Sequence, residues 1–363
     1  MQRTAQAIID LGALEHNFNI ARQFAGNSKL MCVIKANAYG HGMLPVADRL
    51  HAGDGFAVAC VDEALALRWH GIEKPVTVFQ GFHNERELQL CAAKKFWPVV
   101  HHEKQLRLLA SFQTGMPITV WLKISTGMNR LGFAPGKAKS LWRRMKALKA
   151  VGEVKLMTHM ARADEGAQGE LQISNDFTRR QIESFTASTK GLQAERSLAN
   201  SAALVDWPAS RGEWVRPGIM LYGASPFLPG CGSDLNLKPV MKLTSRVIAL
   251  NAHRQGDPVG YGGTWVCPHD MTVAVVAIGY GDGYPRGVVA GTPVLIRGRR
   301  AVIVGRVSMD LLTVDLQGID AKVGDEVVLW GPGLSVDEIA RHANTISYEL
   351  LCNVSNRVHY EYR

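Results

Sequence analysis

The chain lacks paired cysteines, long apolar runs and any internal repeat or low-complexity segment. Its 363 residues include 6 cysteines, and no two of them have the Cys-x-x-Cys or other spacing typical of a metal site. We therefore expect no bound metal, and buried or half-buried free thiols in a reducing compartment. The first residues have no apolar core of signal-peptide length, and no run approaches a membrane span. These absences predict a cytoplasmic protein without membrane association.

A continuous basic surface is also missing, although the formal net charge is +9. Such a charge would suit nucleic acid or anionic lipid as a partner. The basic cluster at 142–149 has the spacing of an amphipathic helix, and the cluster at 297–300 resembles a turn between two β runs. Neither is interleaved with aromatic residues, so we predict no nucleic-acid partner. The excess charge favours anionic small molecules in a local site instead.

Short apolar runs alternate with helix-like stretches up to about residue 230. Roughly eight β runs with helices between them are typical of parallel βα units, and eight in series predict a closed (β/α)8 TIM-like barrel. An open doubly wound sheet is the alternative. The absence of a Gly-x-Gly-x-x-Gly motif after the first strand counts against its dinucleotide-binding form.

The pattern changes beyond about residue 237, where β runs are separated by Gly, Pro and Asp turns. Only 335–344 and 347–354 look helical there. We therefore predict an α/β barrel over residues 1–232 and a mainly β domain over residues 233–363. The boundary is expected in the segment 226–239, which is rich in Pro, Gly and polar residues.

Polar side chains recur where the β runs of the first domain end. Lys35 closes the apolar run at 30–34. The other candidates at or shortly after such ends are Lys123, Arg130, His159, Ser201 and Arg216. The carboxyl ends of barrel strands meet at one face, where functional sites lie. Each residue alone also fits a structural role, such as a surface lysine, a core histidine or a helix cap, and only the shared location favours a site.

Lys35 is the candidate for covalent chemistry. Burial disfavours the charged form of a lysine, so its pKa falls and the amine becomes a nucleophile or base. The partner of such an amine is a carbonyl, and pyridoxal 5′-phosphate is the common cofactor with an aldehyde. Segments 200–203 and 216–223, with Tyr39, supply the small residues and hydroxyls that bind a phosphate. A structural lysine is the alternative on spacing alone.

The chain resembles the alanine racemases, which are fold-type III pyridoxal-phosphate enzymes. Residues 33–42, VIKANAYGHG, match the family's cofactor-attachment signature, and matching segments follow in family order to TISYELLCNV at 345–354. The resemblance covers essentially the whole chain. It implies an isomerase that interconverts L- and D-alanine with two bases on opposite faces of the substrate. It further implies a homodimer with shared active sites that supplies or uses D-alanine for peptidoglycan.

The resemblance also implies roles for single residues. Lys35 binds the cofactor covalently and is one base, and Tyr261 of the second subunit is the other. Arg216 hydrogen-bonds the pyridine nitrogen, while Arg130 holds the cofactor's phenolate oxygen and the substrate carboxylate. The residues that resemble the phosphate-binding set are Tyr39, Ser201, Gly218, Ile219 and Tyr348.

Four further assignments follow from the same resemblance. His159 is a partner of Arg216 and Tyr261, and it is expected to be a cationic neighbour of that tyrosine. Met309 of the second subunit binds substrate beside the carboxylate. Tyr284, also of the second subunit, lines the corridor through which substrate enters. Lys123 matches a lysine that is carbamylated in many members of the family, where it orients Arg130.

Two other functions stay open on the residues alone. A barrel amino-acid decarboxylase of the same fold type places a glutamate at the pyridine nitrogen and a cysteine from the partner chain in the site, and Arg216 argues against it. A non-catalytic pyridoxal-phosphate homeostasis protein has a single domain, and the C-terminal residues with Tyr261 and Met309 argue against that. Activity on serine is not decided by the sequence.

Overall fold

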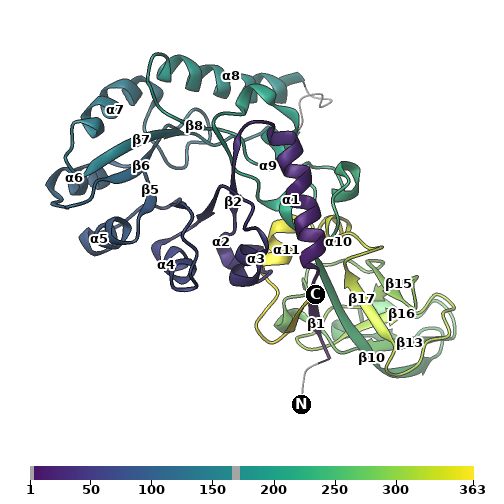
Figure 1. Ribbon diagram of the computed structural model, residues 1–363. Coiled ribbons are helices and arrows are strands. Elements are labelled where there is room, and N and C mark those ends of the chain that lie inside the picture. Colours follow the sequence, from purple (N-terminus) through teal and green to yellow (C-terminus); the bar gives the residue numbers. More distant parts are fainter. Residues whose placement is uncertain (1–3, 166–171) are drawn as a thin grey trace.

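The computed structural model describes residues 4–165 and 172–363, and within them the chain forms a closed barrel and a separate β sheet (Figure 1). Eight parallel strands form the barrel, each pairing with the next along the chain, and the last pairs with the first. They are β2 (Lys29–Val33), β3 (Gly55–Val58), β4 (Val76–Val78), β5 (Phe96–Val100), β6 (Ile118–Lys123), β7 (Val151–Met157), β8 (Arg196–Ser197) and β9 (Trp214–Val215). The predicted barrel is confirmed, and the open doubly wound sheet is excluded.

Helices between the strands cover the outside of the barrel (Figure 1). They include α1 (Leu11–Ala25), α3 (Met43–Arg49), α4 (Val61–Trp69), α5 (Glu85–Ala93), α6 (Glu103–Ser111), α7 (Ala138–Lys146), α8 (Gln172–Thr189) and α9 (Ser201–Asp206). In α7 the side chains of Leu141 and Met145 are buried and the basic residues face outward, so the predicted amphipathic helix is present, but it ends at Lys146 and not at residue 149. None of the helices in the described residues combines the length and apolar character that a membrane span requires.

The C-terminal domain is built on one sheet with the strand order β13-β16-β15-β14-β17-β10-β1-β18. Its strands are β1 (Gln6–Ile9), β10 (Met241–His253), β13 (Met271–Val276), β14 (Pro293–Ile296), β15 (Arg299–Val304), β16 (Leu312–Asp315), β17 (Glu326–Trp330) and β18 (His359–Tyr362). A turn joins β14 to β15, and two helices, α10 (Val336–His342) and α11 (Ser347–Cys352), lie where helices were expected. The mainly β character of this domain is confirmed.

The first strand of the chain belongs to this second sheet, although the sequence interpretation placed residues 1–232 in the barrel. Strand β1 pairs antiparallel with β10, where Gln6 faces Thr244, and parallel with β18, where Gln6 faces His359 (Figure 1). A short alternating run looks the same in either sheet, so its partner strands cannot be told from local pattern. The first and last strands described by the structure therefore lie in the same sheet.

The cysteines are free thiols, as the sequence predicts. Three are buried and two are half-buried. Cys352 is exposed, so the expectation of burial is wrong for this residue. It is the last residue of α11, at the edge where this helix meets the barrel.

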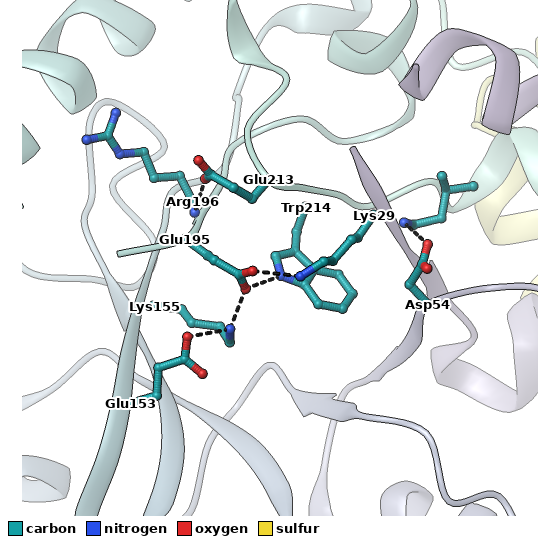
Figure 2. Close-up of polar contacts among 9 residues, drawn as sticks. Lys29, Asp54, Glu153, Lys155, Glu195, Arg196, Glu213 and Trp214 are labelled. Atoms are coloured by element: carbon teal, nitrogen blue, oxygen red, sulfur yellow. Dashed lines mark hydrogen bonds and ion pairs between the residues drawn. The ribbon is translucent and has the colours of Figure 1, made fainter. Parts of the chain in front are cut away.

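A network of charged side chains lies near the N-terminal ends of the barrel strands (Figure 2). The Glu195 carboxylate accepts hydrogen bonds from Lys29 Nζ at 2.7 Å and Trp214 Nε1 at 2.6 Å, and it also pairs with Lys155. Lys155 is only 3% exposed and donates a second bond, 2.7 Å long, to Glu153. This end of a barrel serves stability rather than catalysis. Two carboxylates thus compensate one buried ammonium.

Replacing Glu195 with glutamine is expected to destabilise the fold by about 2–4 kcal/mol at pH 7, because Lys155 loses one of its two carboxylates. Burial would raise the pKa of Glu195, but its hydrogen bonds from Lys155, Lys29 and Trp214 lower it from 4.5 to about 2. The stabilisation is therefore fully present above pH 4.5 and is lost as the pH falls through about 2. Thermal melts of wild type and Glu195→Gln should converge at acidic pH.

A matched control for this prediction is Glu103→Gln. Glu103 pairs with Arg144 at 2.6 Å, but both side chains are more than 40% exposed. An exposed pair contributes about 0–1 kcal/mol, so its loss should leave the melting temperature nearly unchanged. Equal melting temperatures for the two variants would contradict the role of the network.

Candidate active site

A cavity of about 290 Å³ opens at the C-terminal ends of the barrel strands. It is lined by Lys35, Ala59, Phe79, Gln80, Lys123, Arg130, Leu131, Met157, His159 and Arg216. Four of these residues carry cationic groups, and no aspartate or glutamate is among them. A concave site with this charge suits a ligand with several anionic groups. Of the six strand-end residues predicted to converge, Lys35, Lys123, Arg130, His159 and Arg216 line this cavity, and Ser201 does not.

Lys35 lies two residues after the end of β2 and is half-buried at the cavity. Burial lowers the pKa of its amine, and the nearby charge of Arg130 lowers it further. The ammonium lies 6.0 Å from the ring centroid of Phe79. The expectation of a partly desolvated lysine with a lowered pKa is confirmed. Near neutral pH, a larger fraction of such an amine is uncharged, and therefore nucleophilic, than of an ordinary lysine.

Lys123, the last residue of β6, is 9% exposed and lies in the same cavity. Burial, followed by the charges of Arg216 and Arg130, lowers its pKa to about 8. A substantial fraction of a lysine with this pKa is neutral at physiological pH. A second amine with nucleophilic character therefore stands beside the guanidinium groups of the cavity.

Arg216 is buried, at 3% exposure, and its hydrogen-bond partners among the described residues are all neutral. It donates to Ser197 Oγ at 2.6 Å and to the carbonyl oxygens of Thr158 and Leu198 at 2.8 and 3.0 Å. Burial lowers its pKa to about 9. A buried guanidinium without a carboxylate is costly unless an acceptor in the cavity shares its charge.

His159 accepts a hydrogen bond from Arg216, with 3.3 Å between the arginine Nη2 and the histidine Nδ1. Burial, with the charge of Arg216 next, lowers the pKa of His159 well below 6.5. The histidine is therefore neutral at pH 7, and the interpretation of His159 as a cation is wrong. Arg216 is the source of positive charge on this side of the cavity.

A cradle for a small group lies between the start of α9 and the segment after β9. The Gly218 N–H donates to Ser201 Oγ at 2.8 Å, and a Cβ on Gly218 would approach Tyr39 Oη to 2.7 Å. The ring centroids of Tyr39 and Tyr348 are 5.8 Å apart. Ile219 is the next residue, at the start of the 3₁₀ turn Ile219–Tyr222. The structure thus brings together the set predicted to bind phosphate, with Tyr348 contributed by the C-terminal domain of the same chain.

Tyr261 and Met309 do not line the cavity, which is formed by barrel residues. Tyr261 lies in the turn Tyr261–Gly263 between the short strands β11 (Pro258–Val259) and β12 (Trp265–Val266), and it is 70% exposed. Met309 is 53% exposed. Both residues are therefore presented outward by the C-terminal domain, as residues that act on another chain would be.

Tyr284 conflicts with its predicted place in an access corridor. Its side chain is 1% exposed and stacks on Trp330 inside the C-terminal domain, with 5.9 Å between the ring centroids. Tyr280, four residues earlier in the same segment, is 40% exposed. Its backbone N–H donates to the Ser308 carbonyl oxygen at 3.0 Å, next to Met309. A glycine precedes each of the two tyrosines, and local sequence does not tell which one is buried.

The sequence interpretation did not identify the uncharged residues that line the cavity. Those residues are Ala59, Phe79, Gln80, Leu131 and Met157. Ala59 and Phe79 follow β3 and β4 directly and Gln80 comes next, so inspecting the two residues after every β run would have found them. It also missed Glu63, whose carboxylate contacts the segment after Lys35. Among the described residues, no group of three or more His, Cys, Asp and Glu side chains is placed to hold a metal ion.

Both parts of the chain match one enzyme family. The alanine racemase N-terminal domain matches residues 9–226, and the alanine racemase C-terminal domain matches residues 240–362. The chain belongs to the alanine racemase family. Alanine racemase of Nitrosococcus oceani is 51% identical over 357 residues, which are 97% of this chain and 98% of that protein. The resemblance read from the motifs is confirmed.

Solved alanine racemase structures have the same architecture. Biosynthetic alanine racemase from Pseudomonas aeruginosa is 41% identical, covers 100% of both chains and gives a TM-score of 0.95. Alanine racemase from Bartonella henselae with covalently bound pyridoxal phosphate is 29% identical, covers 99% of both chains and gives a TM-score of 0.86. The chain is thus an isomerase of the alanine racemase type.

Proposed function

We propose that this chain interconverts L-alanine and D-alanine with pyridoxal 5′-phosphate as cofactor. The observation that carries the proposal is the convergence of Lys35, Arg130 and Arg216 on one cationic cavity in a member of the alanine racemase family. A racemase must remove a proton from one face of Cα and return one to the other. Purified protein supplied with L-alanine should produce D-alanine by chiral chromatography, and protein that binds no pyridoxal phosphate would overturn the proposal.

The residues of the cavity fit this cofactor. Lys35 offers an amine of lowered pKa to an aldehyde, and the cradle at Gly218 leaves room where a Cβ would meet Tyr39. Tyr39, Ser201, Gly218, Ile219 and Tyr348 are proposed to hold the phosphate. When bound, the cofactor delocalises the electron pair left at Cα after proton removal. The covalently bound pyridoxal phosphate of the Bartonella henselae relative supports the same chemistry.

Arg216 is proposed to donate a hydrogen bond to the ring nitrogen of the cofactor. A guanidinium keeps its proton, so it binds this nitrogen without transferring charge to it. The neutral His159 accepts from Arg216 and fixes its orientation. A decarboxylase of the same fold type has a glutamate at this position, and carbon dioxide release from a basic amino acid would favour that alternative.

The second base is proposed to come from a second copy of the chain. Lys35 acts on one face of Cα, and the phenol of Tyr261 acts on the other. Tyr261 and Met309 are exposed and outside the cavity of their own chain, so a homodimer completes each site. Residues 233–363 would then contribute to the partner's active site, with Met309 and Arg130 beside the substrate carboxylate. We further propose a cytoplasmic enzyme that supplies or uses D-alanine for peptidoglycan.

Lys123 is proposed to be carbamylated. Its pKa of about 8 leaves neutral amine to react with carbon dioxide, and the resulting carboxylate would balance part of the charge of Arg130 and Arg216. We expect Lys123→Ala to lower kcat/KM by about 10-fold or more and Lys123→Glu to retain more activity. A carbonyl signal from ¹³C-labelled bicarbonate should appear in the wild type and vanish in Lys123→Ala. Labelling that is equal in both proteins would contradict the modification.

A further inference from the structure

Four consecutive residues after Lys35 have left-handed backbone conformation, and none of them is glycine. Ala36, Asn37, Ala38 and Tyr39 have φ values between 52° and 55°. Residues with a Cβ avoid this region, and runs of such residues are rare. A segment of this kind persists only when its surroundings fix it, and it is typical of functional sites. Lys35 and Tyr39 stand at its two ends.

Glu63 holds this turn from the neighbouring βα unit. Its Oε1 accepts from the Ala36 N–H at 2.8 Å, and its Oε2 accepts from the Ala59 N–H at 2.7 Å. Ala36 follows Lys35 after β2, and Ala59 lines the cavity after β3. One carboxylate therefore ties two adjacent segments of the cavity rim together. Its negative charge also raises the pKa of Lys35 and so opposes burial and the charge of Arg130, which both lower it.

His41 holds the same turn from inside the protein. This fully buried residue places Nδ1 2.9 Å from the carbonyl oxygen of Tyr39 and 3.2 Å from that of Ala38. Both partners are acceptors, so Nδ1 carries the proton and donates it. Burial lowers the pKa of His41 to about 4, which keeps the ring neutral. Its Nε2 has no hydrogen-bond partner among the residues that the structure describes.

We propose that Glu63 and His41 are positioning residues that lock the left-handed turn and so aim the Lys35 amine and the Tyr39 hydroxyl at the cofactor. This inference rests on the proposed function. A glutamate in the first turn of α4 also resembles a helix cap, and in that role it would stabilise the fold without affecting the cavity. The contact of Oε1 with Ala36, outside α4, distinguishes the two roles.

Glu63→Gln tests the proposal, because the amide has a single acceptor oxygen and no charge. We expect its full-length apoprotein to bind pyridoxal phosphate about 10-fold or more weakly than the wild type. Loss of the negative charge should also lower the pKa of Lys35 further, so the rate of pyridoxal phosphate attachment should reach its half-maximum at a lower pH. The matched control is Asp62→Asn, an exposed acidic residue in the same helical turn.

Three results distinguish the positioning role of Glu63 from a helix cap and from a failure of the proposed function. A Glu63→Gln protein that differs from Asp62→Asn only in melting temperature has lost a helix cap, and this result would overturn the positioning role. A wild type that does not bind pyridoxal phosphate at all would instead overturn the proposed function. Weaker binding together with a shifted pH profile supports the positioning role.

A second pair of variants, at His41, tests the positioning role if Glu63→Gln does not fold. In His41→Asn the side-chain amide replaces the Nδ1–H donor, whereas His41→Leu has no donor. We expect His41→Asn to bind pyridoxal phosphate within about 3-fold of the wild type and His41→Leu to bind about 10-fold or more weakly. Equal affinities for the two variants would overturn the role of His41.

Discussion

Lys35→Ala is expected to lower kcat/KM for alanine racemisation by at least about 10³-fold and to abolish covalent attachment of pyridoxal phosphate. The residue combines the two properties that this chemistry needs, a lowered pKa and a position inside the cationic cavity. Lys123 also lines the cavity, but it lies at the end of a different strand, β6. The loss is therefore not expected to be compensated by a neighbouring amine.

Two measurements check this prediction. Chiral chromatography reports D-alanine formed from L-alanine, and the visible absorbance of the purified protein reports the covalently bound cofactor. Lys104→Ala, at an exposed position of α6, is the control and should change neither readout. A Lys35→Ala protein that keeps its activity within about 10-fold of the wild type would refute the assignment of Lys35 as a base.

The pH dependence of the wild type gives a related readout. A base must be neutral to accept a proton, and burial with Arg130 lowers the pKa of Lys35 from its ordinary value of 10.5. If activity depends on neutral Lys35, it should therefore reach half of its maximum at a pH below 10.5.

The fold could be predicted from the sequence wherever local pattern determines structure. The alternation of β runs and helices identified the barrel because each βα unit is formed by residues close in the sequence. The pairing of β1 with β10 and β18 could not be predicted, because it joins segments more than 200 residues apart. Local periodicity carries no information about such partners.

Part of the site could also be predicted from the sequence. Residues at strand ends, such as Lys35 and Arg216, converge because barrel topology brings all strand ends to one face. Charge state and burial depend on the whole surroundings, which explains the errors for His159 and Tyr284. The left-handed turn and its contact with Glu63 have no sequence signal, since none of the four residues in the turn is a glycine.

Two inactive variants are expected to restore activity to each other when they share a dimer. If Tyr261 acts at the cavity of the partner chain, Lys35→Ala and Tyr261→Phe remove the two bases of a site from different chains. In a mixed dimer, one site then has both bases and the other has neither. Random pairing makes about half of the dimers mixed, and one of their two sites is intact, so co-expression should give about a quarter of the wild-type activity.

The geometry of the single chain is the reason to expect this result. The cavity contains barrel residues, whereas Tyr261 is 70% exposed on a turn of the C-terminal domain. Each variant alone should lose about 10²-fold or more of its activity, which makes the recovery easy to measure. Two affinity tags, one for each variant, allow the mixed dimer to be purified before the assay.

A second mixture supplies the matched control, because it combines two residues of the same cavity. Lys35 and Arg216 both line the cavity of one barrel, so a mixed dimer of Lys35→Ala and Arg216→Ala has one defect in each site. This mixture should show no activity above that of its separate components. Recovery with Tyr261→Phe but not with Arg216→Ala would establish that the tyrosine crosses to the partner. If purified mixed dimers of Lys35→Ala and Tyr261→Phe stay inactive, the tyrosine does not complete the partner's site, and the second base must be sought within the barrel that carries Lys35.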